Sequence, residues 1–328
     1  MQFALKSQIL KHVRSFCLVF ISFLLVPFAF GKEYKIGLVM LGMNAPYYRG
    51  MVVGFEDEVK KRGSVAYSSD AQWKLDKQIA DFEDMLTKGV DGIIINAIDP
   101  KAMVPSIAGA VESGIPVIAI DSGMSPEAPL VTHIQSDSPN NGQMLGAWLV
   151  DEMGDKQIKL VIMSGSKGSE EGKRRRLNLI SGIAESLMKS NNKGKIEIVT
   201  QAWGGWNQND GLKAMEDVLV AHAGGFNVVF SENDSMGMGA RQAVIEAGTK
   251  SDVVYISVDG QKECYELIKD GKYNATTVNN PDKIARTAVD YMFKYLAGER
   301  NIPQKIYTPP MVITKGNVGD VYDPKSVF

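Results

Sequence analysis

The chain has 328 residues, of which 45 % are hydrophobic, and this length favours two domains over a single core. Its formal net charge is −2, and no basic block argues for a nucleic-acid partner. Composition and charge therefore argue against a nucleic-acid-binding protein, and the pattern along the chain has to indicate the function.

Residues 1–31 have the features of a secretory leader. Lys6, Lys11 and Arg14 form a basic start, an apolar run follows, and small residues stand at the positions that a signal peptidase reads. The leader holds three of the 36 basic residues and no acidic one, so cleavage after Gly31 would leave 33 minus 38, or a charge of −5. We expect a periplasmic protein. An uncleaved membrane anchor is the alternative, although the apolar run is short for a span.

The mature chain offers little for covalent or metal chemistry. Cleavage would leave Cys264 as its only cysteine, which excludes an intrachain disulfide. His133 and His222 lie far apart, no Cys or His cluster has metal-site spacing, and no cofactor is expected. A P-loop, a full dinucleotide fingerprint and a Gly-x-Ser-x-Gly elbow are all missing. Asp121 and Asp259 could form an acid/base pair, but nothing in the sequence supports a reaction, so we expect no enzymatic activity.

The first half of the mature chain alternates strands and helices. The apolar run Ile36–Leu41 has the length of a strand that is covered on both faces. After a break, Pro46 suits the first turn of a helix, because the amide hydrogen that proline lacks would have no intrahelical partner there. The same pattern predicts strands at 64–68, 93–95, 117–120 and 131–134 and helices at 75–86 and 103–112.

A second series of elements follows a joint near residues 135–139. The pattern predicts strands at 158–163, 196–200, 228–230, 253–258 and 275–278, and helices at 174–188, 211–220, 236–247, 263–269 and 284–296. Two such series predict an α/β protein with two doubly wound parallel-sheet lobes. The tail, 302–328, is rich in Pro and Gly. Since clefts between domains are common ligand sites, we expect a ligand between the lobes.

Polar residues recur where the predicted strands end. Asn44 follows the first strand, and later strands are followed by Asn96, Asp121, Asn233 and Asp259. Ligands of open α/β sheets bind at the carboxyl ends of the strands, and carboxylates and amides suit the hydroxyls of a polyhydroxylated ligand. Asp and Asn also cap helices and form turns, so each residue alone has a structural alternative.

Aromatic and basic residues add to this pattern. Tyr47, Tyr48 and Trp206 could stack on the apolar face of a sugar, or they could pack locally. The run Lys-Arg-Arg-Arg at 173–176 opens a predicted helix, and we expect at least two of its side chains on a solvated face. One arginine turned into the cleft would donate a rigid fork to ligand oxygens.

These residues together resemble periplasmic substrate-binding proteins of the ribose-binding type, which serve sugar ABC transporters and some chemoreceptors. The matching segments are Asn44-Ala-Pro-Tyr-Tyr, Ile95-Asn-Ala-Ile-Asp-Pro, Gly114-Ile-Pro-Val-Ile-Ala-Ile-Asp, His133-Ile-Gln-Ser-Asp, Phe230-Ser-Glu-Asn-Asp-Ser-Met-Gly, Val258-Asp-Gly and Ala275-Thr-Thr-Val-Asn-Asn-Pro-Asp. The resemblance implies a type I periplasmic binding fold that closes about a hinge. It implies one lobe of 32–136 with 280–310, another of 137–279 with 311–328, and chain crossings near Ser136, Asn279 and Pro310.

The resemblance also implies a set of ligand contacts. They are Asn44, Tyr47, Tyr48, Asn96, Asp121, Arg174, Trp206, Asn233, Asp259 and Asn279. The match at Arg174 needs a one-residue insertion after Gly168. Arg175 and Arg176 are therefore open alternatives, and with Arg174 in the contact role we expect Arg175 to face solvent.

The predicted function is a secreted, non-enzymatic protein that captures a monosaccharide or polyol and delivers it to the membrane permease of an ABC transporter. We expect a monomer. The sequence departs from ribose binders at Ser122, Val258 and Asn279 and in its two tyrosines, so ribose is one candidate among several. A module of the same fold that presents the ligand to a membrane receptor kinase or chemoreceptor is the main alternative. A repressor of the related fold would need N-terminal DNA-binding helices where this chain has a leader, and a secreted enzyme is the remaining alternative.

Overall fold

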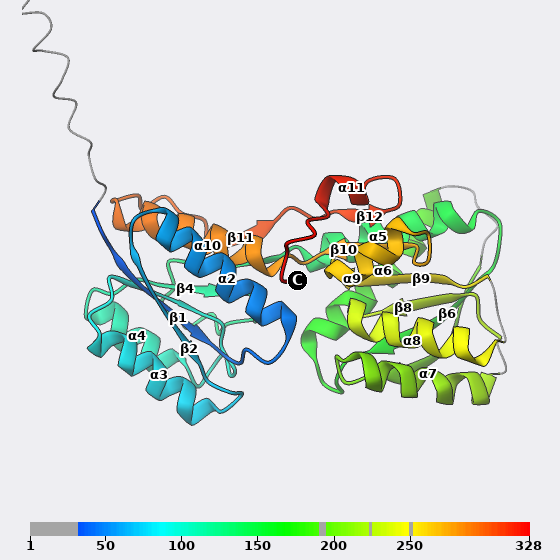
Figure 1. The fold of residues 1–328 in the computed structure, drawn as a ribbon, viewed down its shortest axis with the longest axis horizontal. Helices are drawn as coiled ribbons and strands as arrows, with labels where there is room; N and C mark the ends of the chain where they lie inside the picture. Colours follow the sequence, from blue (N-terminus) through cyan, green and yellow to red (C-terminus); the bar gives the residue numbers. More distant parts are fainter. Residues whose placement is uncertain (1–31, 190–194, 223–224, 249–251) are drawn as a thin grey trace, which may run out of the picture. The chain divides into compact units, whose positions relative to one another are not determined.

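The computed structural model describes residues 32–189, 195–222, 225–248 and 252–328. The predicted leader and its cleavage site lie outside these residues. Figure 1 shows two sheets, each covered by helices on both faces, and each sheet has six strands. We call these two units the first and the second lobe.

The sheet of the first lobe has the order β11-β5-β4-β3-β1-β2, and all of its neighbouring strands are parallel. Its strands are β1 (Lys35–Met40), β2 (Val65–Asp70), β3 (Gly92–Ile95), β4 (Val117–Ile120), β5 (Thr132–Ser136) and β11 (Lys305–Thr308). Its helices are α2 (Pro46–Lys61), α3 (Leu75–Thr87), α4 (Val104–Glu112) and α10 (Pro281–Leu296).

Both faces of this sheet are apolar because successive side chains of a strand point to opposite sides. Ile36 and Leu38 join the buried cluster that holds Phe55 of α2 and the apolar face of α10. Val39 lies between Leu38 and Met40 in the sequence and points to the other side of the sheet. There it joins Phe82 and the apolar faces of α3 and α4. Double coverage is the reason why β1 is an unbroken apolar run in the sequence.

The sheet of the second lobe has the order β12-β10-β9-β8-β6-β7, and only β12, which pairs with β10, runs antiparallel to its neighbour. Its strands are β6 (Ile158–Ser164), β7 (Ile196–Trp203), β8 (Val228–Ser231), β9 (Val254–Asp259), β10 (Ala275–Val278) and β12 (Val312–Thr314). Its helices are α5 (Ser138–Met153), α6 (Glu170–Lys189), α7 (Gln208–His222), α8 (Asp234–Ala247), α9 (Lys262–Lys269) and α11 (Val318–Val321).

Helices α5 and α6 lie unusually close to one another. A Cβ atom at Gly146 of α5 would overlap the carbonyl oxygen of Leu179, and one at Gly182 of α6 would overlap that of Gln143. The two backbones therefore touch where both residues lack side chains. This contact fixes α6, which carries the arginine run, against the sheet.

The predicted fold of two doubly wound parallel-sheet lobes is confirmed, with some elements missed. Helix α5 was not predicted, and β11, β12 and α11 lie in the Pro- and Gly-rich tail. Helix α6 begins at Glu170 rather than at residue 174, so Glu170 and Glu171 occupy its first turn, where acidic side chains complement the helix dipole. The arginine run consequently falls in the second turn.

Within the described part of the chain, no helix combines the length and the apolar character that crossing a membrane requires.

Candidate ligand-binding site

The two aspartates of the predicted site stand at strand ends in unusual backbone conformations. Asp121 directly follows β4 and has φ 59°, and Asp259 ends β9 and has φ 129°. Residues other than glycine seldom adopt positive φ, and such conformations concentrate at functional sites.

A chain of hydrogen bonds connects these aspartates. The Tyr47 hydroxyl donates to Asp121 Oδ1 at 2.6 Å and lies 3.0 Å from Asn279 Oδ1. Asn279 Nδ2 donates to Asp259 Oδ1 at 3.1 Å. Four segments, at the ends of β4, β9 and β10 and at the start of α2, thus converge on one polar cluster.

Burial controls the ionisation of this cluster. It raises the pKa of the Asp121 carboxyl, while hydrogen bonds from Tyr47 and Asn96 oppose the rise. It also raises the pKa of the Tyr47 hydroxyl, and the neighbouring charge of Asp121 adds to that effect. Tyr47 therefore remains a neutral hydrogen-bond donor at any physiological pH.

Arg175 is the arginine that reaches this cluster. Its side chain is 7 % exposed, and Nη1 donates to Asp259 Oδ1 at 2.9 Å and to the Glu232 carbonyl oxygen at 2.6 Å. Nε donates to Glu171 Oε1 at 3.2 Å. Burial disfavours the charge of Arg175, but Asp259 and Glu171 outweigh it and raise the pKa of the guanidinium. The Arg175 guanidinium is therefore fixed in position and always charged.

The expectation that Arg175 faces solvent is wrong. The side chain of Arg174 is 43 % exposed instead, and it pairs with Glu171 at 3.2 Å on the outer side of α6. A shift of one residue turns a helix position by about 100°, so the register of the insertion decided which arginine points inward. The expectation that at least two side chains of the run are solvated is confirmed by its first two residues, since the lysine is exposed and Arg174 is partly exposed, whereas Arg176 donates to Glu232 Oε1 at 2.9 Å.

Glu232 supports the candidate site and was missed by the sequence analysis. It is fully buried, and its carboxylate accepts from Ser164 Oγ at 2.8 Å and from the Gly165 amide at 2.9 Å, besides Arg176. Buried carboxylates need such partners. Glu232 thus ties the end of β6 to α6, and a sequence signal for it was its place directly after the buried strand β8.

Asn96 and Asn233 have their side chains engaged by the protein. Asn96 Nδ2 donates to Asp121 Oδ2 at 3.1 Å, and its Oδ1 accepts from the Ser122 amide at 3.3 Å. Asn233 Oδ1 caps α8 by accepting from the Met236 amide at 2.9 Å. Its Nδ2 donates to the Trp206 carbonyl oxygen at 3.1 Å. For Asn233, the capping alternative therefore describes the structure.

Trp206 lies on the second-lobe side of the cluster. Its φ is 63°, and its ring occupies the space that a side chain at Gly165 would need. The Arg175 guanidinium lies 5.9 Å from the ring centroid, within range of a cation–π interaction. The ring is therefore held between a glycine of the β6 end and the buried arginine.

On the first-lobe side, the aromatic residues form a row that includes an unpredicted member. Tyr47 and Tyr48 meet edge to face at 5.3 Å, and Tyr48 meets Trp73 in the same way at 5.4 Å. Trp73 Nε1 donates to Asn44 Oδ1 at 3.0 Å. Trp73 also lies at the strand ends, because it follows β2 with φ 61° and its ring packs against Gly42, which follows β1. Trp73 is 49 % exposed.

The class of this protein is defined by its fold and its site together. The fold has two doubly wound lobes, and the site is a polar and aromatic cluster at the ends of their strands. A family model described as a periplasmic binding protein domain matches residues 36–300, and the chain belongs to this family. The prediction of a binding protein rather than an enzyme is confirmed by this match.

Individual relatives cover almost the whole chain. The ribose import binding protein of Bacillus subtilis (strain 168) is 31 % identical over 85 % of this chain and 87 % of its own length. An ABC transporter solute-binding protein from Mycobacterium smegmatis, solved with bound glycerol, is 27 % identical, covers 90 % of this chain and 99 % of its own, and has a TM-score of 0.77. One from Actinobacillus succinogenes with bound D-allose is 25 % identical, covers 88 % and 100 %, and has a TM-score of 0.78.

Proposed function

We propose that this protein captures a monosaccharide or polyol between its two lobes and delivers it to the permease of an ABC transporter. The observation that carries the proposal is a series of hydrogen bonds that connects the two aspartates. It runs from Asp121 through Tyr47 and Asn279 to Asp259, and Asp259 in turn accepts from the buried guanidinium of Arg175. Carboxylate, amide, phenol and guanidinium side by side match the donors and acceptors of several adjacent hydroxyls.

The ligand contacts that we propose follow from this geometry. Asn44, Tyr47, Tyr48, Asp121, Arg175, Trp206, Asp259 and Asn279 would contact the ligand. Asn96 and Asn233 would act by holding Asp121 and Trp206. Trp73 joins the proposal because its half-exposed ring extends the aromatic row next to Asn44. In this form the contact role passes from Arg174 to Arg175.

The organisation of the chain is part of the same proposal. Residues 1–31 would direct export to the periplasm and be removed, and the mature chain would act as a monomer. The lobes would be 32–136 with 280–310 and 137–279 with 311–328, closing on the ligand about the three crossings. Mass measurement of the exported protein and size-exclusion chromatography test these points.

A ligand screen tests the function itself. D-Ribose, D-allose, xylitol and glycerol form a suitable panel, because relatives are named for or solved with these compounds. A ligand present at about 100 times its Kd should stabilise the protein by about 2.7 kcal/mol in a thermal-shift assay. Uptake of the radiolabelled ligand should then depend on this protein in cells. If no sugar or polyol shifts the melting temperature and calorimetry detects no binding, the proposal fails.

The relatives argue for import over sensing, since the Bacillus subtilis protein is named for ribose import. No described feature favours the sensor alternative.

A further inference from the structure

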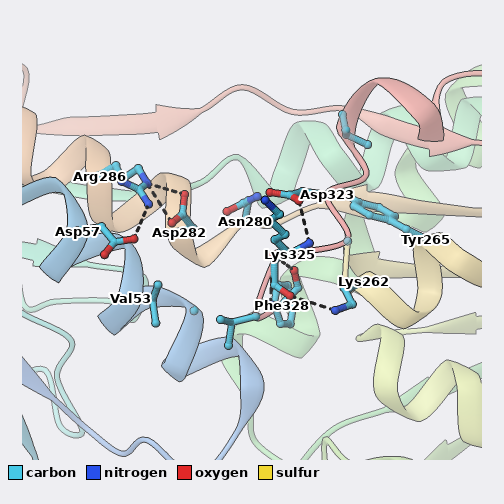
Figure 2. A pocket seen from close by; sticks show the side chains of 15 residues that line it. Val53, Asp57, Lys262, Tyr265, Asn280, Asp282, Arg286, Asp323, Lys325 and Phe328 are labelled. Carbon is cyan, nitrogen blue, oxygen red and sulfur yellow. Dashed lines mark hydrogen bonds and ion pairs between the residues drawn. The ribbon is translucent and has the colours of Figure 1, made fainter. Parts of the chain in front are cut away.

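The last six residues, Asp323–Phe328, form a segment that touches both lobes, and we call it the tail segment. It leaves α11 and passes between α2 and α9 (Figures 1 and 2). On the second-lobe side, Lys262 Nζ of α9 donates to the carbonyl oxygens of Pro324 and Ser326, each at 3.2 Å. The tail segment is thus anchored at its start to the second lobe.

The other end of the tail segment packs against the first lobe. The Phe328 ring meets the Tyr47 ring edge to face, with centroids 5.3 Å apart and planes at 85°. The Phe328 Cβ lies 3.1 Å from the position that a Cβ at Gly50 would take. Phe328 lines a cavity of about 300 Å³, whose lining includes no member of the hydrogen-bonded series. Figure 2 shows Phe328 among these lining side chains.

This contact bears directly on the candidate site. The Tyr47 hydroxyl contacts Asp121 and Asn279. Its position is set by the orientation of the rigid ring that carries it. Phe328 supports that ring on one edge, and Tyr48 supports it on another. Without Phe328, the ring would border the open cavity and gain rotational freedom.

We propose that Phe328 is a positioning residue for ligand binding, which acts by fixing the Tyr47 ring so that its hydroxyl is held between Asp121 and Asn279. The proposal rests on the function proposed above, because it assigns Tyr47 to the ligand site. It adds a residue that influences ligand affinity from outside the strand ends. This residue lies on the tail segment, which Lys262 anchors to the second lobe.

The first test follows Tyr47 without any ligand. In the full chain labelled with 3-fluorotyrosine, Tyr47→Phe assigns the Tyr47 fluorine resonance. Phe328→Ala should move or broaden that resonance and leave the one of Tyr307, an exposed residue of β11, unchanged. An unchanged Tyr47 resonance in Phe328→Ala overturns the proposal.

The second test measures affinity by calorimetry with whichever of D-ribose, D-allose, xylitol and glycerol the wild type binds best. Phe328→Ala should weaken binding by about three- to tenfold, the range expected for one aromatic pair, while Phe328→Leu should lose less. In a Tyr47→Ala background, Phe328→Ala should add nothing further. Wild-type affinity in Phe328→Ala overturns the proposal even if the resonance moves.

A pair of glycine variants gives a matched control that leaves Phe328 in place. Gly50→Ala in α2 should displace Phe328, because the new Cβ would also lie 3.2 Å from Pro281 Cγ, and it should reproduce both effects. Gly109→Ala in α4 has open space around its Cβ and should change neither, although both variants gain the same helix propensity. Equal results for the two variants overturn the proposal. If the wild type binds no member of the panel, the proposed function fails, and the Tyr47 resonance alone decides whether Phe328 positions this ring.

Discussion

The two lobes contribute different chemistry to the candidate site. The first lobe supplies aromatic rings, amides and one carboxylate, Asp121, whose partners Tyr47 and Asn96 are neutral. The second lobe supplies a buried ion pair, in which Arg175 and Asp259 meet at 2.9 Å with side chains that are 7 % and 12 % exposed. The first-lobe carboxylate therefore has neutral hydrogen-bond partners, whereas the second-lobe carboxylate is paired with a positive charge.

This difference means that recognition and stability are coupled to different extents in the two lobes. Burial raises the pKa of both Asp121 and Asp259, so the folded state is less favourable for either charge than water is, and removing the Asp121 carboxyl relieves that cost without separating an ion pair. Removing one member of the second-lobe pair instead leaves the other charge buried without its partner. We expect loss of Asp121 to weaken binding without lowering stability, and loss of Arg175 or Asp259 to weaken binding and stability together.

The largest effect should come from breaking the ion pair. Arg175→Ala should lower the free energy of unfolding by about 3–5 kcal/mol, because Asp259 loses its compensating charge. It should also weaken ligand binding by more than about a hundredfold, since the fork is lost. Calorimetry and chemical unfolding measure both. Arg174→Ala is the control, since that side chain is 43 % exposed and pairs only with Glu171 among the described residues. If Arg174→Ala loses more affinity than Arg175→Ala, the contact role belongs to Arg174.

The carboxylates should separate the lobes next. Asp121→Ala and Asp259→Ala should each weaken binding by about 2 kcal/mol or more, because ligand hydroxyls would be buried without partners. Only Asp259→Ala should also lower the melting temperature clearly. Calorimetry and thermal unfolding of both variants provide the test, and unchanged affinity in both, with the fold intact, would remove the aspartates from the site.

Two buried groups, His133 in the first lobe and Asp234 in the second, should contribute pH dependences of stability with opposite signs. Burial, followed by the charge of Lys305, lowers the pKa of His133 in β5 to about 4. Its contribution to stability is present above the unfolded pKa of about 6.5 and is lost as pH falls towards 4. Burial raises the pKa of Asp234 in α8 to about 7, so its contribution is present below about pH 4 and is lost as pH rises through 7.

Two variants isolate these slopes between pH 4.5 and 7. Relative to the wild type, the free energy of unfolding of Asp234→Asn should rise with pH, and that of His133→Gln should fall with pH. Each pKa unit corresponds to about 1.4 kcal/mol. Urea unfolding at several pH values gives the differences, and slopes of the same sign would refute this contrast between the two groups.

The smallest effect concerns the tryptophans. Ligand should change the intrinsic fluorescence saturably, and Trp206→Phe should remove most of that signal, because the ring lies against Arg175 in the second lobe. Trp73→Phe should remove a smaller part, and Trp148→Phe in α5 should remove none. A full signal with wild-type affinity in Trp206→Phe would mean that this ring only anchors its loop.

The fold could be predicted from the sequence because its signals are local. Doubly covered strands such as β1 and β4 are continuous apolar runs, and helices with one apolar face show their period in any window. Helix α5 has weak patterning over a Pro- and Asn-rich start, and β11 and β12 are short strands whose pairing with β5 and β10 is set by residues far away.

The site was predictable only in part for the same reason. The place of Asp121 and Asp259 at strand ends could be predicted because a polar residue directly after a buried strand is visible in the sequence. The inward arginine was misassigned because neighbouring helix positions face different directions. Trp73 was missed because its position depends on the left-handed turn at Gln72 and Trp73, and Phe328 because nothing local connects it with Tyr47.

The left-handed conformation of Asp121 has a consequence for engineering this protein as a biosensor. Glycine adopts φ 59° without the cost of a side chain, so Asp121→Gly should raise the stability of the empty protein by about 1 kcal/mol while it removes a hydroxyl partner. A laboratory selection for heat resistance without sugar in the medium should therefore enrich glycine at this position and erode recognition. The same selection with sugar present should retain aspartate, and sequencing of both populations would reveal the difference.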